Sequence, residues 1–467
     1  MIISSFFKKY DDNEFLYCTN TRRKLTYGEF FDLSSRVASI FAETGISSND
    51  RIFFSTDNSI ELYLAWTATI ILGADIVLID PNYSNDLINS IYKKLKPTLF
   101  ITDKKKFSLC KVITPGDLSQ MISLYSPYKG PSNTLSDVIS FTSGTESLPK
   151  GVVRNISSYF DNAVKFSSEI GIDIPCKNIL STFSGYYLGG FYNSFIIPIV
   201  NGWKITIIPN FYPNLVVKFW SVVKENHVDT LWLVPSIINL LNTFALRNKQ
   251  TQNLSSIVKH VLCGTSPLLL DSRVKFKENF GLNIMENYSL SETLFISSQR
   301  HKDRDHSVGN LMSYVDMDNN LSKISVRTPY LLTKYINLSG NDISYKKKSL
   351  FDTGDLGEIV YRKLSIIGRE KDLIIRGGVN ISPKYIEEIL ATSSIDEIAV
   401  IGAPDIISGE KIICYYVSKF NFDKELKLLS KSKLNRIFRP EKFIRLDAFP
   451  KTSSGKILKT KLKNFYK

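Results

Sequence analysis

The sequence predicts an α/β protein with a large N-terminal domain of parallel sheets covered by helices and a small α+β C-terminal domain. Two observations predict this class. Over the first 367 residues, short β-rich runs alternate with helical patterns, as is typical of parallel sheets whose crossover helices cover them. In the last hundred residues the alternation gives way to a compact set of strand-like and helical segments.

The strands expected in the large domain are short apolar runs rich in β-branched and aromatic residues. They lie at residues 51–57, 98–103, 138–144, 178–184, 204–210, 230–235 and 260–265. Helical patterns lie between several of these runs, for example at 59–73 and 215–227. Ligands of such sheets bind beyond the carboxyl ends of the strands, so the polar segments that follow these runs are the first candidates for a site.

The small domain is expected at residues 368–467, after a large domain at 1–367. Residues 384–394 and 422–438 form helical patterns, and the second of these is basic. The strand-like runs are 395–405, 411–420 and 441–449, and a Gly/Ser loop and a Lys-rich tail follow them. This set of elements is large enough to build a core of its own.

The chain carries 59 Lys and Arg against 45 Asp and Glu, a net charge of +14. Such a charge favours anionic partners: a nucleotide, coenzyme A, an acidic carrier protein, a membrane surface or a nucleic acid. A basic solvated surface is an equally good explanation. Zinc-finger, RNA-recognition and basic-helix signatures are missing from the sequence, which argues against nucleic acid.

Five scattered cysteines without CxxC spacing and only four histidines make a zinc site unlikely. The start "MIISSFFKKY" lacks the pattern of a secretory signal, and no apolar run is long enough for a transmembrane helix. A reducing cytoplasm is the simplest compartment for this chain.

The segment "FTSGTESLPKG", residues 141–151, has the equipment of a phosphate-binding loop. Hydroxyls and a lysine can donate to phosphate, and the glycine lets the backbone approach it; these residues are Thr142, Ser143, Gly144, Thr145 and Lys150. The spacing is not that of a Walker loop, and a plain turn is the alternative explanation for such a cluster.

Together with four later segments, this loop resembles the acyl-adenylate-forming superfamily, which includes acyl- and aryl-CoA ligases. The loop resembles TSGTTGxPKG, and "ENYSLSE" at 286–292 resembles YGxTE. "FDTGD" at 351–355 matches YxTGD, and the glycine-rich segment 368–388 matches GRxKDxIxxxGxxIxPxEIE. "PKTSSGKILK" at 450–459 matches the C-terminal lysine motif of the family.

The resemblance implies an enzyme that joins a carboxylate to the α-phosphate of ATP and releases pyrophosphate. A thiol then attacks the acyl-adenylate, and AMP leaves. Two anions must meet in the first step, so positive charge and Mg²⁺ are needed in the site.

The family pattern also implies a role for individual residues. Thr142, Ser143, Gly144, Thr145 and Lys150 would hold the β- and γ-phosphates, and Glu292 would bind Mg²⁺ with Thr145. Tyr288 would stack on adenine, with Gly264, Thr265, Asn287 and Ser291 nearby. Asp355 would accept both ribose hydroxyls beside Arg369, and Lys456 would reach the carboxylate and the α-phosphate. The catalytic set is therefore Lys456, Glu292, Thr145 and Lys150.

For the second step, the resemblance implies that the small domain is mobile and rotates about a hinge at Lys371. Gly377 and Gly378 would then face the pantetheine arm of the thiol substrate, where a glycine allows close backbone approach. A plain β-turn is an equally good explanation of the two glycines.

The acyl group is expected to lie near residues 180–191 and Cys263, in a pocket that includes Phe183, Ser184, Tyr186, Tyr187 and Gly189. Ser184 stands where many CoA ligases have a histidine and where amino-acid-activating domains usually have an aspartate. Without that charge an α-amino acid is disfavoured, and the aromatic residues favour a fatty or aromatic acid. A core aromatic cluster is the alternative.

Coenzyme A is the expected acceptor, and the phosphopantetheine of an acidic carrier protein acting in trans is the alternative. A non-catalytic nucleotide-binding relative is the alternative from another class. Glu146, Ser147 and Ser289 depart from the common family pattern. The Glu-Ser pair resembles a variant of some fatty-acyl ligases, so we expect Glu146 to point away from pyrophosphate or to reach it only through Mg²⁺.

Overall fold

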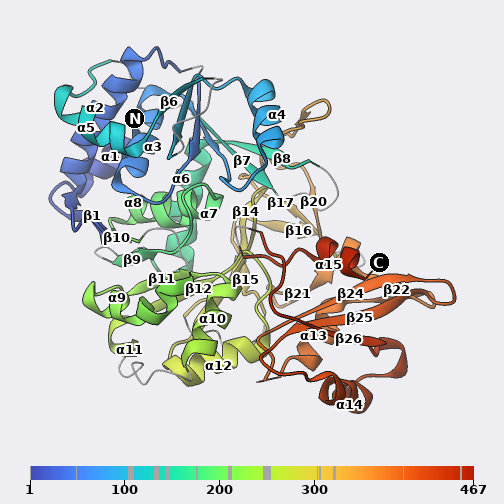
Figure 1. Ribbon diagram of the computed structural model, residues 1–467. Coiled ribbons are helices and arrows are strands. Elements are labelled where there is room, and N and C mark those ends of the chain that lie inside the picture. The colour runs from blue at the N-terminus through green and yellow to red at the C-terminus, as the bar shows by residue number, and fades with distance from the viewer. Residues whose placement is uncertain are drawn as a thin grey trace.

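The computed structural model describes residues 2–48, 50–103, 110–130, 136–142, 148–174, 177–208, 213–245, 254–301, 303, 305, 307–318, 322–392, 394–452 and 455–466. Two large sheets and a third, smaller one organise this part of the chain (Figure 1). The predicted α/β class is confirmed, with a large N-terminal region of sheets and helices and a smaller C-terminal unit.

In the described residues, the first sheet has eight strands in the order β19-β18-β8-β7-β4-β3-β5-β6. Its strands are β3 (Arg51–Ser55), β4 (Asp75–Leu78), β5 (Leu99–Thr102), β6 (Lys111–Ile113), β7 (Asp137–Thr142), β8 (Lys150–Asn155), β18 (Lys334–Ile336) and β19 (Ile343–Ser344). The strands from β6 to β7 run parallel, whereas β8 pairs antiparallel with β7 and with β18.

The second sheet has thirteen strands among the described residues, in the order β16-β17-β20-β21-β15-β14-β13-β12-β11-β9-β10-β1-β2. They are β1 (Glu14–Cys18), β2 (Lys24–Thr26), β9 (Asn178–Ser181), β10 (Lys204–Ile207), β11 (Thr230–Leu233), β12 (His260–Cys263), β13 (Ile284–Leu290), β14 (Leu294–Ser298), β15 (Asn310–Leu311), β16 (Asp316–Asp318), β17 (Lys323–Arg327), β20 (Phe351–Val360) and β21 (Lys363–Arg369).

All seven apolar runs expected to be strands are strands, namely β3, β5, β7, β9, β10, β11 and β12. In the second sheet, the predicted parallel pairing holds from β1 to β13 in the strand order, and β2 joins β1 antiparallel. From β13 to β21 the neighbouring strands pair antiparallel. Parallel strands need a crossover, usually a helix, and no α-helix lies between β13 and β21 in the described chain, so these strands are joined by shorter connections.

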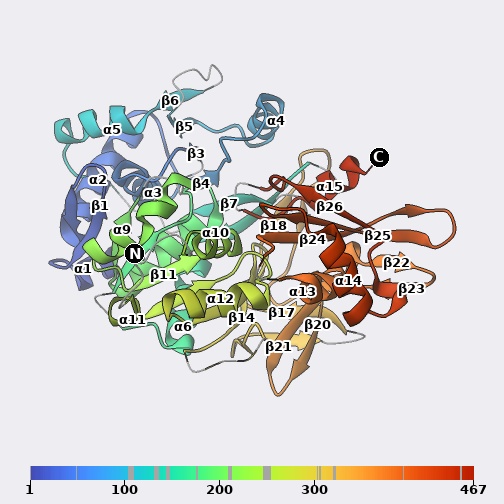
Figure 2. The same cartoon turned by 60° about the horizontal axis from the view of Figure 1, so that its bottom comes forward.

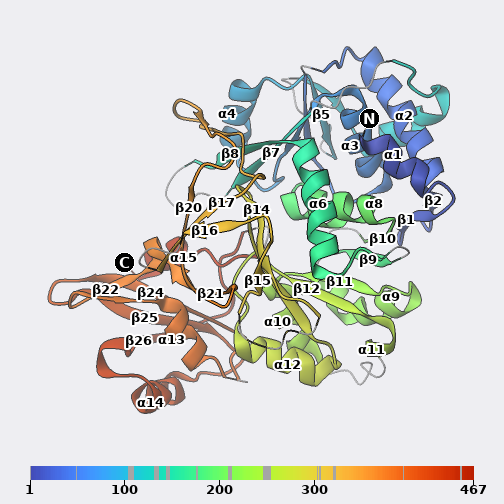
Figure 3. The ribbon, with the colours of Figure 1, turned by 180° about the vertical axis from the view of Figure 1, so that it is seen from behind.

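The helices of the large region are α1 (Ile2–Lys9), α2 (Tyr27–Glu43), α3 (Ile60–Leu72), α4 (Asn85–Leu95), α5 (Pro115–Met121), α6 (Ile156–Ile170), α7 (Leu188–Phe191), α8 (Ile197–Asn201), α9 (Phe219–Glu225), α10 (Pro235–Ala245), α11 (Leu254–Ile257) and α12 (Leu270–Phe280). The expected helix at 59–73 is α3, which begins after the N-cap Ser59 and ends at Gly73, a residue with φ of 75°. The long helix α6 crosses the rear of the molecule between the two large sheets (Figure 3).

The third sheet carries its own core. Its strands are β22 (Ile374–Arg376), β23 (Val379–Ile381), β24 (Glu397–Asp405), β25 (Gly409–Val417) and β26 (Lys442–Leu446), and its helices are α13 (Pro383–Leu390), α14 (Asp423–Lys433) and α15 (Lys459–Phe465). Alternate residues of β24 and β25 enter two separate apolar clusters, with Val400 in one and Ile401 in the other. Helices α13 and α14 contribute to the first cluster and α15 to the second.

The domain boundary at 367/368 stays a prediction. Strand β21 of the second sheet ends at Arg369, and the third sheet starts at Ile374. Between them lies a short 3-10 helix, η5 (Glu370–Asp372). Turned by 60°, the molecule shows α12 beside α13, where the large region meets the third sheet (Figure 2). None of the helices within the described ranges is long and apolar enough to cross a membrane.

Candidate active site

A cleft with a volume of about 340 Å³ lies where the C-terminal unit meets strands β12, β13 and β21. Helices α10, α12 and α13 and the loop before α15 complete its wall. Eight of the residues predicted for the site line it: Cys263, Thr265, Asn287, Tyr288, Asp355, Arg369, Lys371 and Lys456. The cleft therefore combines residues that lie nearly two hundred positions apart in the sequence.

Asp355 is the centre of a buried polar cluster in this cleft. Its side chain is only 5 % exposed, and Arg369 Nε donates to its Oδ1 at 2.7 Å. Tyr288 donates its hydroxyl proton to Oδ2 at 2.6 Å. The cluster forms because Asp355 on β20 and Arg369 on β21 are cross-strand partners in an antiparallel pair. A carboxylate has room for about four hydrogen bonds, so Asp355 can still accept from a ligand.

Buried polar atoms without partners lie beside this cluster. In the described structure, Asn287 Nδ2 and Thr265 Oγ1 are buried and have no hydrogen-bond partner. Thr265 also adopts a positive φ of 78°, which is uncommon for a threonine. Unsatisfied buried groups are costly, so they indicate a place where a ligand or water supplies the missing bonds. A heteroaromatic base with donors and acceptors on its edge fits this need.

Gly264 leaves room for the side chain of Asn287. A Cβ atom at position 264 would lie 2.5 Å from Asn287 Oδ1, closer than such atoms approach in proteins. The glycine therefore lets β12 and β13 bring the Asn287 amide to the cleft wall.

Lys456 faces the same cleft from the loop before α15. Its backbone amide donates to Thr452 Oγ1 at 3.1 Å, and Gly455 before it has φ of 80°. Burial lowers the pKa of Lys456 to about 8, and the nearby Arg369 adds to this effect, whereas Asp355 and Asp372 oppose it. The ammonium group is thus available as a charge that the described part of the cleft has not neutralised.

The phosphate-loop residues Ser143, Gly144 and Thr145, together with Glu146 and Ser147, lie outside the described residues. The loop's flanks are described: Thr142 ends β7 and Lys150 begins β8, opposite one another in the strand pair. Lys150 Nζ lies 5.5 Å from the centre of the Tyr335 ring. Tyr335 in turn donates its hydroxyl proton to Glu292 Oε1 at 2.7 Å, so Lys150 and Glu292 share one neighbour.

The residues predicted for the acyl pocket do not all meet in the cleft. Cys263 lines it, but among the described lining residues Phe183, Ser184, Tyr186, Tyr187 and Gly189 are missing. Phe183 and Tyr187 instead lie with their ring centres 6.1 Å apart, and a Cβ at Gly189 would press on both rings. Phe183 and Phe191 belong to the large apolar core. Their role in acid binding stays a prediction.

Gly377 and Gly378 form the two-residue turn between β22 and β23. Both have positive φ, 55° at Gly377 and 77° at Gly378, as is typical of the tight turns that join antiparallel strands. In the described structure no atom lies within 4 Å of a Cβ built on either glycine. The turn thus fits the alternative noted above, and a pantetheine contact stays a prediction.

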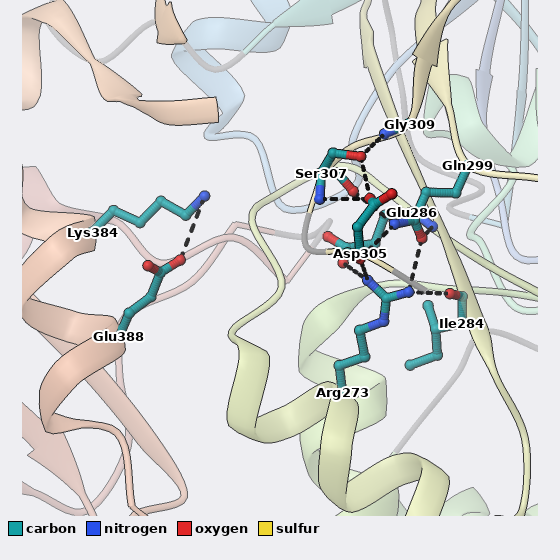
Figure 4. Close-up of polar contacts among 9 residues, drawn as sticks. All are labelled: Arg273, Ile284, Glu286, Gln299, Asp305, Ser307, Gly309, Lys384 and Glu388. Atoms are coloured by element: carbon teal, nitrogen blue, oxygen red, sulfur yellow. Dashed lines mark hydrogen bonds and ion pairs between the residues drawn. The ribbon is translucent and has the colours of Figure 1, made fainter. Parts of the chain in front are cut away.

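One buried ion pair at the cleft was not predicted from the sequence. Arg273 Nη1 on α12 donates to Glu286 Oε1 at 3.1 Å, and Arg273 Nη2 donates to Gln299 Oε1 at 3.0 Å. Figure 4 shows this cluster facing Lys384 and Glu388 on α13. Burial raises the pKa of Glu286 to about 7, although Arg273 and Lys384 act in the opposite direction. The contacts join helix α12, strand β13 and the loop that follows β14, so no single sequence motif would reveal them.

Ser291, which was predicted for the nucleotide site, contacts Arg154 through its backbone carbonyl. Arg154 Nη1 donates to the Ser291 carbonyl at 2.9 Å, and Arg154 Nε donates to the Tyr330 carbonyl at 2.9 Å. Arg154 is completely buried. It therefore ties β8 to the segment that carries Glu292.

These features indicate a nucleotide-binding enzyme. The cleft offers a carboxylate–guanidinium pair and unsatisfied polar atoms for a nucleoside, and an uncompensated lysine enters it from a separate structural unit. Ligand pockets commonly lie beyond the carboxyl ends of parallel strands and between structural units, as this cleft does.

The chain belongs to the AMP-binding enzyme family. The family model "AMP-binding enzyme" matches residues 5–318, and "AMP-binding enzyme C-terminal domain" matches residues 385–456. The chain is an enzyme of the acid–thiol ligase type, and its curated relatives include proteins named CoA ligases, which supports ATP-dependent acyl-CoA ligation.

Three similar proteins illustrate the relationship. The long-chain-fatty-acid–CoA ligase FadD13 of Mycobacterium tuberculosis H37Rv is 25% identical over 487 residues, covering 96% of this chain and 94% of that protein. ATP-bound MatB from Rhodopseudomonas palustris has a TM-score of 0.88 at 21% identity, covering 100% of this chain and 98% of that one. O-succinylbenzoate coenzyme A synthetase from Bacillus subtilis, in complex with ATP and magnesium ion, has a TM-score of 0.85 at 21% identity, covering 99% and 98%. The two structures confirm the fold.

Proposed function

We propose that this enzyme activates a fatty or aromatic carboxylic acid with ATP and transfers the acyl group to the thiol of coenzyme A. The observation that carries the proposal is the shared cleft of Asp355, Arg369 and Lys456. A nucleoside-binding carboxylate and a free ammonium group in one cavity suit a reaction in which a phosphate and a carboxylate must be brought together.

The nucleotide would bind along the cleft with its ribose on Asp355. The free acceptor capacity of this carboxylate suits two hydroxyl donors, and Arg369 holds it in place. The base would lie beside Tyr288 and give Asn287 Nδ2 and Thr265 Oγ1 the partners that they lack. Binding would therefore remove the cost of two unsatisfied buried groups.

In the adenylation step, an oxygen of the acid attacks the α-phosphorus, and pyrophosphate leaves. Lys456 would donate to the oxygens of the acid and the α-phosphate, on which negative charge crowds as they approach. Its electrostatic interaction with these oxygens is stronger in the cleft than in water, because the surroundings are partly shielded from solvent. In the second step the thiol sulfur attacks the acyl carbon, and AMP leaves.

Glu292 and Thr145 would hold Mg²⁺, which neutralises phosphate charge when it is bound. The described residues place no cation against the Glu292 carboxylate, whose side-chain partner is the neutral Tyr335 hydroxyl. A carboxylate of this kind is a suitable ligand for a hard cation. Lys150 and the phosphate-loop hydroxyls would hold the β- and γ-phosphates.

The names of two similar proteins support an apolar acid and coenzyme A. The relative FadD13 is named a long-chain-fatty-acid–CoA ligase, and the structural neighbour from B. subtilis is named for an aromatic acid, o-succinylbenzoate. The test below distinguishes coenzyme A from the alternative acceptor, a carrier protein.

The test is a panel of fatty, aromatic and short dicarboxylic acids incubated with ATP and Mg²⁺, with either coenzyme A or candidate carrier proteins. We expect AMP and an acyl-CoA thioester with at least one fatty or aromatic acid. Thioester formation on carrier protein alone would mean that a carrier protein, and not coenzyme A, is the acceptor. Turnover of short dicarboxylic acids alone would mean that the substrate is a short dicarboxylic acid and not a fatty or aromatic acid. The absence of AMP formation with every acid would contradict the proposal and favour a non-catalytic relative.

A further inference from the structure

The side chain of Tyr335 connects two residues that lie 142 positions apart and that the proposed function uses for phosphate and metal. Its hydroxyl donates to Glu292 Oε1 at 2.7 Å. Its ring lies under the Lys150 ammonium, with Nζ 5.5 Å from the ring centre. One aromatic side chain thus contacts both an anionic and a cationic member of the expected site.

Strand pairing fixes the backbone of Tyr335. Residue 335 on β18 lies opposite Val152 on β8, the strand that Lys150 begins. Just before it, Thr333 donates its amide to the Val153 carbonyl at 2.9 Å, and Leu332 donates its amide to the Glu292 carbonyl at 2.7 Å. The backbone around Tyr335 is therefore tied to both partners of its side chain.

Aromatic packing also restrains the ring of Tyr335. Tyr345 packs edge-on against it with ring centres 5.8 Å apart, and Tyr345 packs in turn against Phe351 at 5.9 Å. These contacts keep the hydroxyl beside Glu292 Oε1, to which it donates.

The contact leaves Glu292 oriented but not neutralised. A tyrosine donor occupies Oε1, and the described residues give Oε2 no hydrogen-bond partner. A lysine or arginine in the place of Tyr335 would fix the carboxylate equally well, but its charge would compete with a metal ion. A neutral donor restricts the rotation of the carboxylate without reducing its attraction for a cation.

We propose that Tyr335 is a positioning residue for adenylation, whose hydroxyl aims the Glu292 carboxylate at the metal ion and whose ring sets the position of the Lys150 ammonium. The inference rests on the proposed function, because Glu292 and Lys150 have their metal and phosphate roles only there. It adds to that function a residue outside the motifs that indicated the site.

Two substitutions separate the two contacts. Tyr335→Phe removes the hydroxyl and keeps the ring, whereas Tyr335→Leu removes both. The matched control is Tyr330→Phe, because Tyr330 donates its hydroxyl proton to Asp161 Oδ2 at 2.6 Å in the same segment, away from Glu292. Thermal unfolding of each variant reports whether the fold is kept.

The measurement is calorimetric titration of the full-length protein with ATP at a series of Mg²⁺ concentrations, without acid. We expect Tyr335→Phe to raise the Mg²⁺ concentration at half-maximal ATP affinity on the order of tenfold, as for the loss of a hydrogen bond to a charged group. Its ATP affinity at saturating Mg²⁺ should stay within twofold of wild type. Tyr335→Leu should also weaken this limiting affinity, by roughly two- to fivefold for a lost cation–π contact.

A Mg²⁺ midpoint of Tyr335→Phe within twofold of wild type would overturn the inference, and so would an equal change in Tyr330→Phe. This comparison needs only the Phe variants, so it stands even if Tyr335→Leu fails to fold. Failure of the proposed function gives a different result, namely a wild-type protein that does not bind ATP at any Mg²⁺ concentration.

Discussion

At the scale of single residues, Lys456 is the group whose charge can be tested most directly by pH. Burial lowers its pKa to about 8, so the ammonium form is lost as the pH rises through that value. The proposed step needs the charged form, so adenylation by the free enzyme should fall with rising pH above about 8. The check is pyrophosphate exchange in the presence of the carboxylic acid substrate, measured as kcat/KM for ATP between pH 6.5 and 9.5.

The charge-conserving variant Lys456→Arg is the control for this profile. A guanidinium stays protonated throughout the range, so any activity that it keeps should not decline above pH 8. A wild-type profile that rises between pH 8 and 9.5, or one that Lys456→Arg reproduces, would show that another group controls the rate.

Gly264 supplies a second test at this scale. The Cβ of Gly264→Ala would lie 2.5 Å from Asn287 Oδ1, the mobile end of a side chain, so the amide should move while the fold is kept. We expect ATP to bind roughly tenfold more weakly, as for the loss of one or two hydrogen bonds. Calorimetric ATP titration measures the change.

Gly116→Ala is the matched control, because Thr114 Oγ1, at 3.7 Å, is the nearest described neighbour of its Cβ. It should bind ATP like wild type. Unchanged affinity in Gly264→Ala would mean that Asn287 does not contact the base.

The sequence motifs place Asp355 and Arg369 side by side because the two residues face each other within regular elements. Asp355 and Arg369 are 14 residues apart on neighbouring strands, and both lie in recognisable motifs. Tyr335 and Arg273 were not predicted, because neither lies in one of the motifs and their contacts depend on tertiary structure. The pairing of β8 with β18 brings Tyr335 to Lys150, and the placement of α12 beside the cleft brings Arg273 to Glu286.

At the scale of elements, the loop of Gly455 and Lys456 must dock against α10. Gly455 has φ of 80°, and a Cβ there would overlap Ser236 Oγ on α10. Gly455→Ala should therefore hold the lysine loop away from the cleft. We expect acid-dependent pyrophosphate exchange to fall roughly tenfold or more, because a small displacement of a reacting group has a large effect on rate.

Two measurements keep this prediction specific. Thioester formation from supplied acyl-adenylate should change less than twofold in Gly455→Ala, because that step does not need the docked lysine. Gly171→Ala, at the C-cap of α6, shares the positive φ of 76° but has no atom within 4 Å of its Cβ in the described structure. If it slows exchange as much as Gly455→Ala, backbone strain rather than docking is the cause.

Element prediction from the sequence succeeded where burial imposes a pattern. The strands of the parallel region are short apolar runs, and all seven expected runs are strands. The antiparallel strands from β15 to β21 are more polar and partly exposed, as in β17 with Lys323 and Arg327 exposed at its ends. Their pairing depends on turns and tertiary contacts, which a single sequence does not specify.

At the scale of the whole molecule, the cleft exists because two separately packed units meet. The small unit has its own apolar clusters, and few hydrogen bonds between described residues join it to the large region near α10 and α12, such as Lys275 Nζ to the Thr392 carbonyl at 3.4 Å. Such an interface is compatible with the expected rotation about Lys371, which would carry Lys456 out of the cleft.

The central claim is that Lys456, brought by the small unit to a nucleotide on Asp355, drives adenylation of an acid. The most direct measurement is acid-dependent exchange of labelled pyrophosphate into ATP, with the acid that the panel identifies. Lys456→Ala should lose on the order of 10²-fold or more of the exchange rate, as for the removal of a group that stabilises developing charge, and should still bind ATP. Lys463→Ala, which removes an exposed lysine on α15, should match wild type. Exchange by Lys456→Ala at the wild-type rate would contradict the account.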